Sequence, residues 1–213
     1  MENVKIIRFN ELVLSGLPTV NTTIISAKNG RKISKTIRTL KRKWPVVWIR
    51  TAVPTGESPL LNVKNNQGIE MTLKKISRLP HGSNVLMYPS HKEKETHSGI
   101  LVLHTNGQVT LELVPSAFYR DLSRGRGTPS VSFTKQPGAF FRKIKNKTAS
   151  KSIPVSEEAA MKVLHQLENE GVLSNVRDLE KPGEELSLEF DWHPSSGIHF
   201  VDLTRIKQRF RRS

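Results

Sequence analysis

The stretch Gly30–Trp44, GRKISKTIRTLKRKW, decides the fold expected for the first part of the chain. Its apolar residues recur at intervals of four, three and four, and they are Ile33, Ile37, Leu40 and Trp44. This spacing places all of them on one side of an α-helix, where they can pack on a hydrophobic core. Pro45 follows directly and should end the helix. We therefore predict a helix over about residues 30–44.

The rest of this helix surface is strongly basic. Seven cationic side chains and no acidic ones occupy it: Arg31, Lys32, Lys35, Arg38, Lys41, Arg42 and Lys43. We call these seven side chains the basic ridge. An ordinary solvated helix face mixes the two signs of charge, because opposite charges four residues apart stabilise a helix. The ridge therefore indicates a surface that contacts a polyanion.

The composition favours the same class of partner. The chain has 213 residues and a net charge of +15, with 36% hydrophobic and 25% charged residues, which is typical of a folded globular protein. The segment 154–213 has eight basic and eleven acidic residues, a balance of −3, so residues 1–153 carry +18. Nucleic acid is the first partner to expect for such a basic region, and an anionic membrane surface is the second.

The absence of cysteine excludes several kinds of chemistry. Disulfides, thiolate metal sites and cysteine nucleophiles all need a residue that the sequence lacks. Charged residues are scattered through the N-terminal apolar residues, and apolar runs elsewhere are short. We therefore expect neither a signal peptide nor a transmembrane segment. The expected location is intracellular, cytoplasmic or nuclear, and not secreted.

The remaining patterns predict an α+β fold with a largely antiparallel sheet. Runs rich in β-branched and large apolar residues are the predicted strands. These strands are Val4–Leu14, Thr22–Ser26, Val46–Val53, Ile69–Leu73, Asn84–Tyr88, Leu186–Trp192 and Ile198–Leu203. A second helix is predicted over about residues 156–170, with Ser156 as its N-cap and Gly171 at its end.

Two hairpins follow from the strand pattern. In Gly99–Val114, the pair Asn106-Gly107 predicts a two-residue type I′ turn that pairs Thr105 with Gln108. That register places Ile100 and Val102 on the same face as Val109, Leu111 and Leu113, and Glu112 on the other. The second is a C-terminal β-hairpin. Its first strand alternates strictly, so its four apolar residues face inward while Glu189 and Asp191 face outward.

The segment Arg120–Lys151 has nine basic residues against the single Asp121, together with several phenylalanines. This combination suits phosphate contacts with base stacking on single-stranded nucleic acid, although the phenylalanines could equally pin the segment to the core. The cationic residues predicted to contact nucleic acid here are Arg124, Arg126, Lys135, Arg142, Lys143, Lys145 and Lys147. The expected domains are a basic α+β core (1–120), a basic flexible linker (121–153) and a helix-plus-hairpin unit with a basic tail (154–213).

Signals for enzymatic chemistry are weak. The sequence contains no phosphate-binding glycine loop, no nucleophile elbow and no zinc-protease motif. The single set that suggests a metal or acid–base site comprises Asp191, His193, His199 and Asp202, around the second hairpin. His199 and Asp202 would face opposite ways in a regular strand. We therefore predict no metal site and no cofactor.

These observations predict a non-enzymatic nucleic-acid-binding protein. RNA or single strands are favoured over duplex DNA, because no groove-reading helix pattern is present. One alternative is a self-associating structural or matrix-like protein, viral or otherwise, that bridges nucleic acid and an anionic membrane or shell. Its copies would associate through the acidic second helix and a basic surface. A second alternative is a metal-dependent nuclease using Asp191 and His193. No small-molecule substrate is expected.

Overall fold

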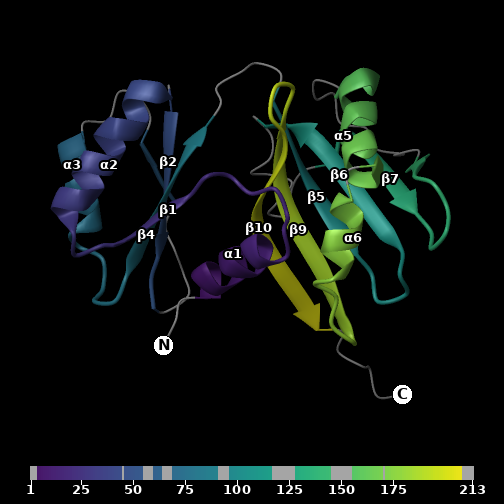
Figure 1. The fold of residues 1–213 in the computed structure, drawn as a ribbon, viewed down its shortest axis with the longest axis horizontal. Helices are drawn as coiled ribbons and strands as arrows, with labels where there is room; N and C mark the ends of the chain where they lie inside the picture. The colour runs from purple at the N-terminus through teal and green to yellow at the C-terminus, as the bar shows by residue number, and fades with distance from the viewer. Residues whose placement is uncertain are drawn as a thin grey trace. The chain divides into compact units, whose positions relative to one another are not determined.

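The computed structural model describes residues 4–44, 46–54, 60–63, 69–90, 96–116, 128–144, 155–169 and 171–207. The chain forms two compact units. Unit 1 comprises Met1–Asn10 and Val20–Glu93, and unit 2 comprises Glu11–Thr19 and Lys94–Ser213. Each unit combines helices with an antiparallel sheet, which confirms the predicted α+β class (Figure 1).

Unit 1 is built on a four-stranded antiparallel sheet in the order β1-β4-β2-β3. The strands are β1 (Thr23–Ser26), β4 (Asn84–Ser90), β2 (Val46–Ala52) and β3 (Leu60–Val63). Two helices, α2 (Gly30–Lys43) and α3 (Ile69–Ile76), lie together against this sheet (Figure 1). The core between them includes Ile33, Ile37 and Ile76 from the helices and Ile49 and Met87 from the strands.

Helix α2 confirms the first prediction from the sequence. The Asn29 side chain caps it by accepting a hydrogen bond from the Lys32 backbone N–H at 3.1 Å. Ile33 and Ile37 are completely buried, as the apolar stripe requires. At the other end, the Trp44 N–H donates to the Leu40 carbonyl before the chain becomes extended. Helix α2 is therefore held by its apolar stripe, with the basic ridge on its other sides.

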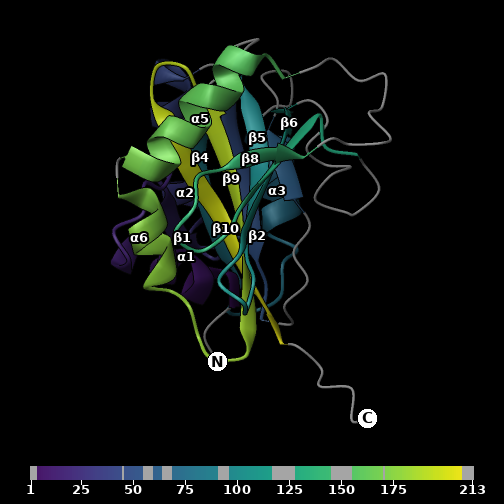
Figure 2. The same ribbon diagram turned by 90° about the vertical axis from the view of Figure 1, so that its right-hand side faces the viewer.

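Unit 2 contains a six-stranded antiparallel sheet in the order β10-β9-β5-β6-β7-β8. Its strands are β5 (His97–Leu103), β6 (Val109–Pro115), β7 (Val131–Lys135), β8 (Arg142–Ile144), β9 (Glu184–His193) and β10 (Gly197–Lys207). Helices α5 (Glu157–Asn169) and α6 (Val172–Arg177) pack on one face of it (Figure 2). The core of unit 2 lies between these helices and the apolar face of the sheet.

Two predicted strands are helices. Val4–Leu14 is helix α1, which buries Ile6 in unit 1 and Leu12 in unit 2. Its many β-branched residues favoured a strand, but packing on the cores overrode that weak local preference. The segment predicted as strand Ile69–Leu73 belongs to α3, in which Ile69, Leu73 and Ile76 all pack on the core of unit 1. The helical spacing becomes visible only when Ile76 is included.

The predicted register of the first hairpin is wrong by one residue. Leu103 pairs with Val109, and Gly107 in the connecting loop has a left-handed φ of 78°. The His104 N–H closes the loop on the Gln108 carbonyl at 2.9 Å, so three residues lie between them. A three-residue loop with glycine in this conformation is the common alternative to a type I′ turn. As a result Leu101 and Leu103 face the core with Leu111, and Ile100 and Val102 lie on the opposite face.

The C-terminal elements follow the sequence closely. Ser156 caps α5 by accepting a hydrogen bond from the Ala159 N–H at 3.2 Å. Leu186, Leu188, Phe190 and Trp192 are buried, as their alternation predicts. Strands β7 and β8 of the unit 2 sheet lie within the predicted linker, residues 121–153. The predicted domain boundaries themselves stay a prediction. None of the helices in the described ranges is long and apolar enough to cross a bilayer.

Candidate functional site

The face of the unit 2 sheet opposite α5 and α6 is lined by polar side chains. Residues that pair across antiparallel strands share a face, so the register identifies its members. They include Ser98, Thr110, Glu112, Ser187, Glu189, Asp191, Asp202 and Thr204. We call this surface the polar face. It holds five carboxylates, Glu112, Glu185, Glu189, Asp191 and Asp202, in a chain whose net charge is +15, so it differs in charge from the rest of the protein.

Three of these carboxylates lie at one level of the sheet. Asp202 on β10 pairs with Glu189 on β9, and Glu189 pairs with Ile100 on β5. Ile100 in turn pairs with Glu112 on β6. Glu189, Asp202 and Glu112 are all partly buried. We call these three side chains the carboxylate row.

A β-bulge in β10 brings Asp202 into the carboxylate row. Phe200 pairs with Phe190 and Asp202 with Glu189, so Val201 is the extra residue between them. In a regular strand Val201 would have faced Glu189, and Asp202 would have pointed toward the core side. The expectation that His199 and Asp202 face opposite ways applied to a regular strand. The bulge instead places both of them on the polar face.

Asp191 and His193, two other members of the predicted metal or acid–base set, make hydrogen bonds to nearby serine side chains. Asp191 accepts a hydrogen bond of 2.5 Å from Ser98 Oγ, and it pairs across the strands with His199. His193 is only 3% exposed, and its Nδ1 lies 2.8 Å from the Ser195 hydroxyl in the adjoining turn. Among the residues that the structure describes, no group of three or more His, Asp or Glu side chains could hold a metal by itself. The four residues therefore do not form one ready-made metal site.

The surroundings of Glu112, one member of the row, change its ionisation. Burial raises the pKa of its carboxyl above the ordinary value of 4.5, because partial removal from water disfavours the charged form. The folded state then keeps the Glu112 proton to a higher pH than the unfolded chain does. At a pH above the pKa of Glu112 in the folded state, the ionised carboxylate lowers the free energy of unfolding. Glu112 therefore makes the polar face less stable at neutral pH than an uncharged residue would.

Replacing Glu112 by Gln should raise the melting temperature at about pH 7 and change it much less at about pH 4, because wild-type Glu112 is itself protonated in acid. Thermal unfolding followed by circular dichroism at both values measures the difference between variant and wild type. Glu158→Gln serves as the control, since Lys162 lowers the pKa of this exposed carboxyl. A Glu112→Gln variant that is less stable than wild type at neutral pH would contradict the expected effect.

The basic ridge is exposed to solvent, with Lys41 the one member that is partly covered. It lies entirely on α2 in unit 1. Of the basic residues predicted beyond it, Arg142 and Lys143 are exposed on β8 in unit 2. Arg124, Arg126, Lys145 and Lys147 lie outside the described residues. The predicted contact residues thus belong to two different units.

The Lys135 side chain is largely buried and paired with an acidic residue. Its Nζ lies 2.9 Å from Glu168 Oε1 on α5 and donates to the Ala139 carbonyl. The same ammonium is 5.7 Å and 5.6 Å from the ring centres of Phe140 and Phe141, within the range of a cation–π contact. The Lys135 and Glu168 side chains are only 17% and 25% exposed. The pair ties β7 to α5.

Replacing Lys135 by Ala should lower the free energy of unfolding by roughly 1–3 kcal/mol, because it leaves the Glu168 carboxylate partly buried without its cation. Lys143→Ala is the matched control, and this exposed residue should change stability by less than about 0.5 kcal/mol. Chemical denaturation measures both. Equal effects of the two substitutions would show that the Lys135–Glu168 pair contributes nothing particular.

The fold of this chain is shared with enzymes that were crystallised with adenine nucleotides. One is N5-carboxyaminoimidazole synthase from Aspergillus clavatus in complex with ADP and 5-aminoimidazole ribonucleotide. It has a TM-score of 0.51 and 9% identity, over 94% of this chain and 43% of that chain. The carboxyaminoimidazole ribonucleotide synthase structure from the same organism, complexed with ATP, has a TM-score of 0.51 and 9% identity, over 93% and 43% of the chains.

A RimK domain protein of the ATP-grasp type from Sphaerobacter thermophilus has a TM-score of 0.49 and 12% identity, over 95% of this chain and 58% of that chain. At such identities the likeness is one of fold. The chain spans about half the length of the proteins it matches, between 43% and 58% in these three cases. No protein-family model matches the sequence, and no curated protein matches it either.

This likeness contradicts the function predicted from the sequence. The likeness overturns the prediction of a non-enzymatic nucleic-acid-binding protein, together with its matrix-like and nuclease alternatives. It also overturns the predicted partners, which were nucleic acid, a membrane surface and a second copy. The Aspergillus clavatus enzyme of this fold holds ADP and a small ribonucleotide, so the expectation of no small-molecule substrate is overturned as well. The physical reason is that net charge reports affinity for phosphate and does not distinguish a phosphate polymer from a single nucleotide.

Sequence reasoning missed the carboxylate row as a unit. Alternation in β9 did place Glu189 outward, and the hairpin prediction placed Glu112 on the outer face. The missing information was that β5 pairs with β9, and that a bulge turns Asp202 onto the same side. Neither feature has a local sequence signal that would have joined these residues.

Proposed function

We propose that this chain is the ATP-binding part of an ATP-dependent synthase or ligase. The observation that carries the proposal is the fold likeness, which extends over 94% of the chain, to a synthase holding ADP and a ribonucleotide. The polar face supports it, because it gathers carboxylates in a protein with a strong positive charge.

Glu189 and Asp202 suit the magnesium ion that accompanies ATP. Their side chains come from adjacent strands at the same level of the sheet, and both offer the oxygen atoms that Mg²⁺ prefers. Proteins usually bind this ion through one or two carboxylates plus the phosphates of a substrate. The absence of a three-residue metal cluster within the described ranges is therefore compatible with the proposal. When bound, the ion would neutralise the phosphate charge of the nucleotide.

A backbone N–H of β10 would orient one of the two carboxylates. The Leu203 N–H donates to Asp202 Oδ1 at 2.9 Å, which fixes one oxygen of that carboxylate. Ser98 similarly holds Asp191 beside the row. Glu112 lies on the same level but two strands from Glu189, beyond Ile100. Its raised pKa gives it a proton to exchange at a higher pH than an ordinary carboxyl, which suits an acid–base role toward a bound substrate.

Isothermal titration of the whole chain with ATP, in the presence and absence of Mg²⁺, tests the proposal. We expect saturable binding of one ATP per chain that weakens by at least about tenfold when Mg²⁺ is chelated. ADP should bind at the same site and compete with ATP. Absence of saturable binding at about 1 mM ATP with Mg²⁺, where a Kd of that size corresponds to about −4 kcal/mol, would overturn it.

A further inference from the structure

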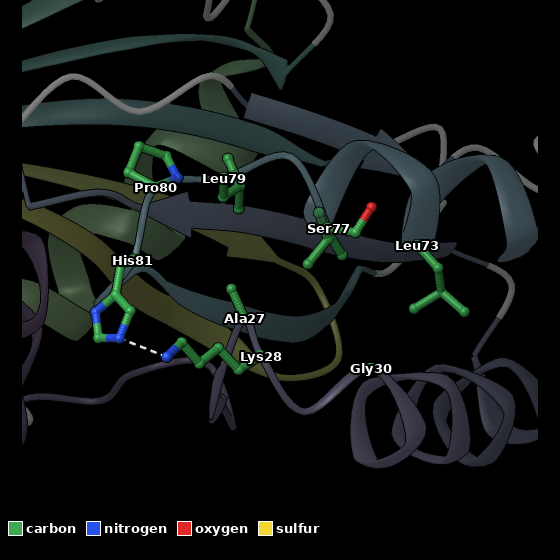
Figure 3. Close-up of a pocket in the computed structure, with 9 residues that line it drawn as sticks. Ala27, Lys28, Gly30, Leu73, Ser77, Leu79, Pro80 and His81 are labelled. Atoms are coloured by element: carbon green, nitrogen blue, oxygen red, sulfur yellow. Dashed lines mark hydrogen bonds between the residues drawn. The ribbon is translucent and has the colours of Figure 1, made fainter.

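A pocket in unit 1 has the properties of a second ligand site. Its volume is about 480 Å³, within the range typical of small-molecule sites. Three segments of unit 1 form it (Figure 3): the turn before α2, the C-terminal half of α3, and the turn that follows α3. All the residues that line it lie in unit 1, whereas the polar face consists of residues of unit 2.

One end of the pocket is basic. Lys28 and His81, which are 53 positions apart in the sequence, point toward each other, and Lys28 Nζ is hydrogen-bonded to His81 Nε2 (Figure 3). Two side chains that carry positive charge or bind a proton thus converge at one place. Gly30, the first residue of α2, also lines the pocket, and Figure 3 shows it on the other side of the view from His81. The first N–H groups of a helix lack acceptors within it and favour an anion.

The other side of the pocket is apolar. Leu73 and Ile76 from α3 and Leu79 from the following turn line it. None of the residues lining the pocket is acidic. A ligand that matches these surfaces has a compact anionic group at one end and an apolar body at the other.

We propose that this pocket binds a small phosphate monoester with an apolar body. Lys28 and His81 would contact the phosphate, and Leu73, Ile76 and Leu79 would contact the body. A phosphate matches this end better than a carboxylate does, because a phosphate dianion carries more charge and offers three terminal oxygens to the ammonium and the imidazole. The inference goes beyond the proposed function, because it places a second ligand in unit 1.

The test uses phenyl phosphate as the probe and the ¹H–¹⁵N spectrum of the whole chain as the readout. We expect saturable shifts confined to residues around Lys28, Gly30 and His81. The double substitution Lys28→Gln with His81→Gln should weaken binding by at least about tenfold, since two charge-assisted contacts are lost. Both side chains are exposed, so the variant should fold as the wild type does. The matched control is Lys32→Gln, an exposed lysine of α2 that does not line the pocket.

Further probes separate the parts of the proposal. Inorganic phosphate and benzoate should both bind more weakly than phenyl phosphate, because one lacks the apolar body and the other the phosphate. Unchanged binding by the double variant would overturn the site. Shifts spread along the whole basic ridge, without saturation, would also overturn it, since they indicate unspecific attraction of anions. Glu189→Gln should leave phenyl phosphate binding intact, so a failure of ATP binding and a failure of this pocket are distinguishable.

Discussion

Replacing Glu189 by Gln, or Asp202 by Asn, should lower the affinity for ATP in the presence of Mg²⁺ by at least about tenfold. Each substitution keeps the size of the side chain but removes its negative charge and replaces one acceptor oxygen by an NH2 donor. In the Asp202→Asn variant, the new amide oxygen would still accept from the Leu203 N–H that holds Asp202 in the wild type. The loss therefore reports metal binding rather than local rearrangement. Isothermal titration with ATP and Mg²⁺ measures it directly.

Two controls accompany these substitutions. Glu180→Gln removes a charge of the same sign from an exposed position outside the polar face, and it should leave the affinity unchanged. Titrations with the metal chelated should show little difference between wild type and either variant, because the carboxylates act through the ion. If Glu189→Gln and Asp202→Asn bind ATP as tightly as Glu180→Gln does, the carboxylate row is not the magnesium site.

Replacing Phe190 by Ala should destabilise unit 2 by about 3–5 kcal/mol, which is the usual cost of truncating a buried aromatic residue. Phe190 is fully buried, and its ring meets that of Phe200 edge-on at 5.8 Å between centres. The substitution leaves a cavity under β9, the strand that carries Glu189. We therefore expect weaker ATP binding as a secondary effect of the loss of stability.

The same substitution at Phe140 provides a matched control. Phe140 is 81% exposed and makes an exposed cation–π contact with Lys135, so Phe140→Ala should change the free energy of unfolding by less than about 1 kcal/mol. Trp192 is the one tryptophan of unit 2, whereas Trp44 and Trp48 belong to unit 1. Urea denaturation followed by fluorescence, in a background with Trp44→Phe and Trp48→Phe, therefore reports unit 2 alone. Equal effects at Phe140 and Phe190 would contradict the assigned core.

The elements that could be predicted are those with a strong local period. Ile33 and Ile37 in α2 and the alternating residues of β9 lie as the sequence indicates. The helix period of about 3.6 residues and the strand period of about two can be distinguished within a few residues. Val4–Leu14 and Ile69–Leu73 were wrong because β-branched content is a weak guide when the apolar pattern fits either structure. The first hairpin failed at its loop, where Gly107 permits a turn one residue longer.

The candidate site was predictable only in fragments. Asp202 was singled out, but the bulge at Val201 that sets its direction has no signal in the sequence. Glu112 was placed on the outer face of its hairpin without any reason to join it to Glu189. The basic ridge was recognised correctly as an exposed surface, yet its charge suggested the wrong partner. Charge density alone does not identify which phosphate compound a protein binds.

The sequence by itself determined α2 with its apolar stripe and basic ridge, the cap and extent of α5, and the inward residues of β9. Tertiary structure decided that β5 lies between β6 and β9, so that Glu112, Glu189 and Asp202 share one level of one sheet. The physical reason is range. Helix and strand periods are set by neighbours a few residues apart, whereas strand pairing and register depend on how apolar faces distant in sequence pack together.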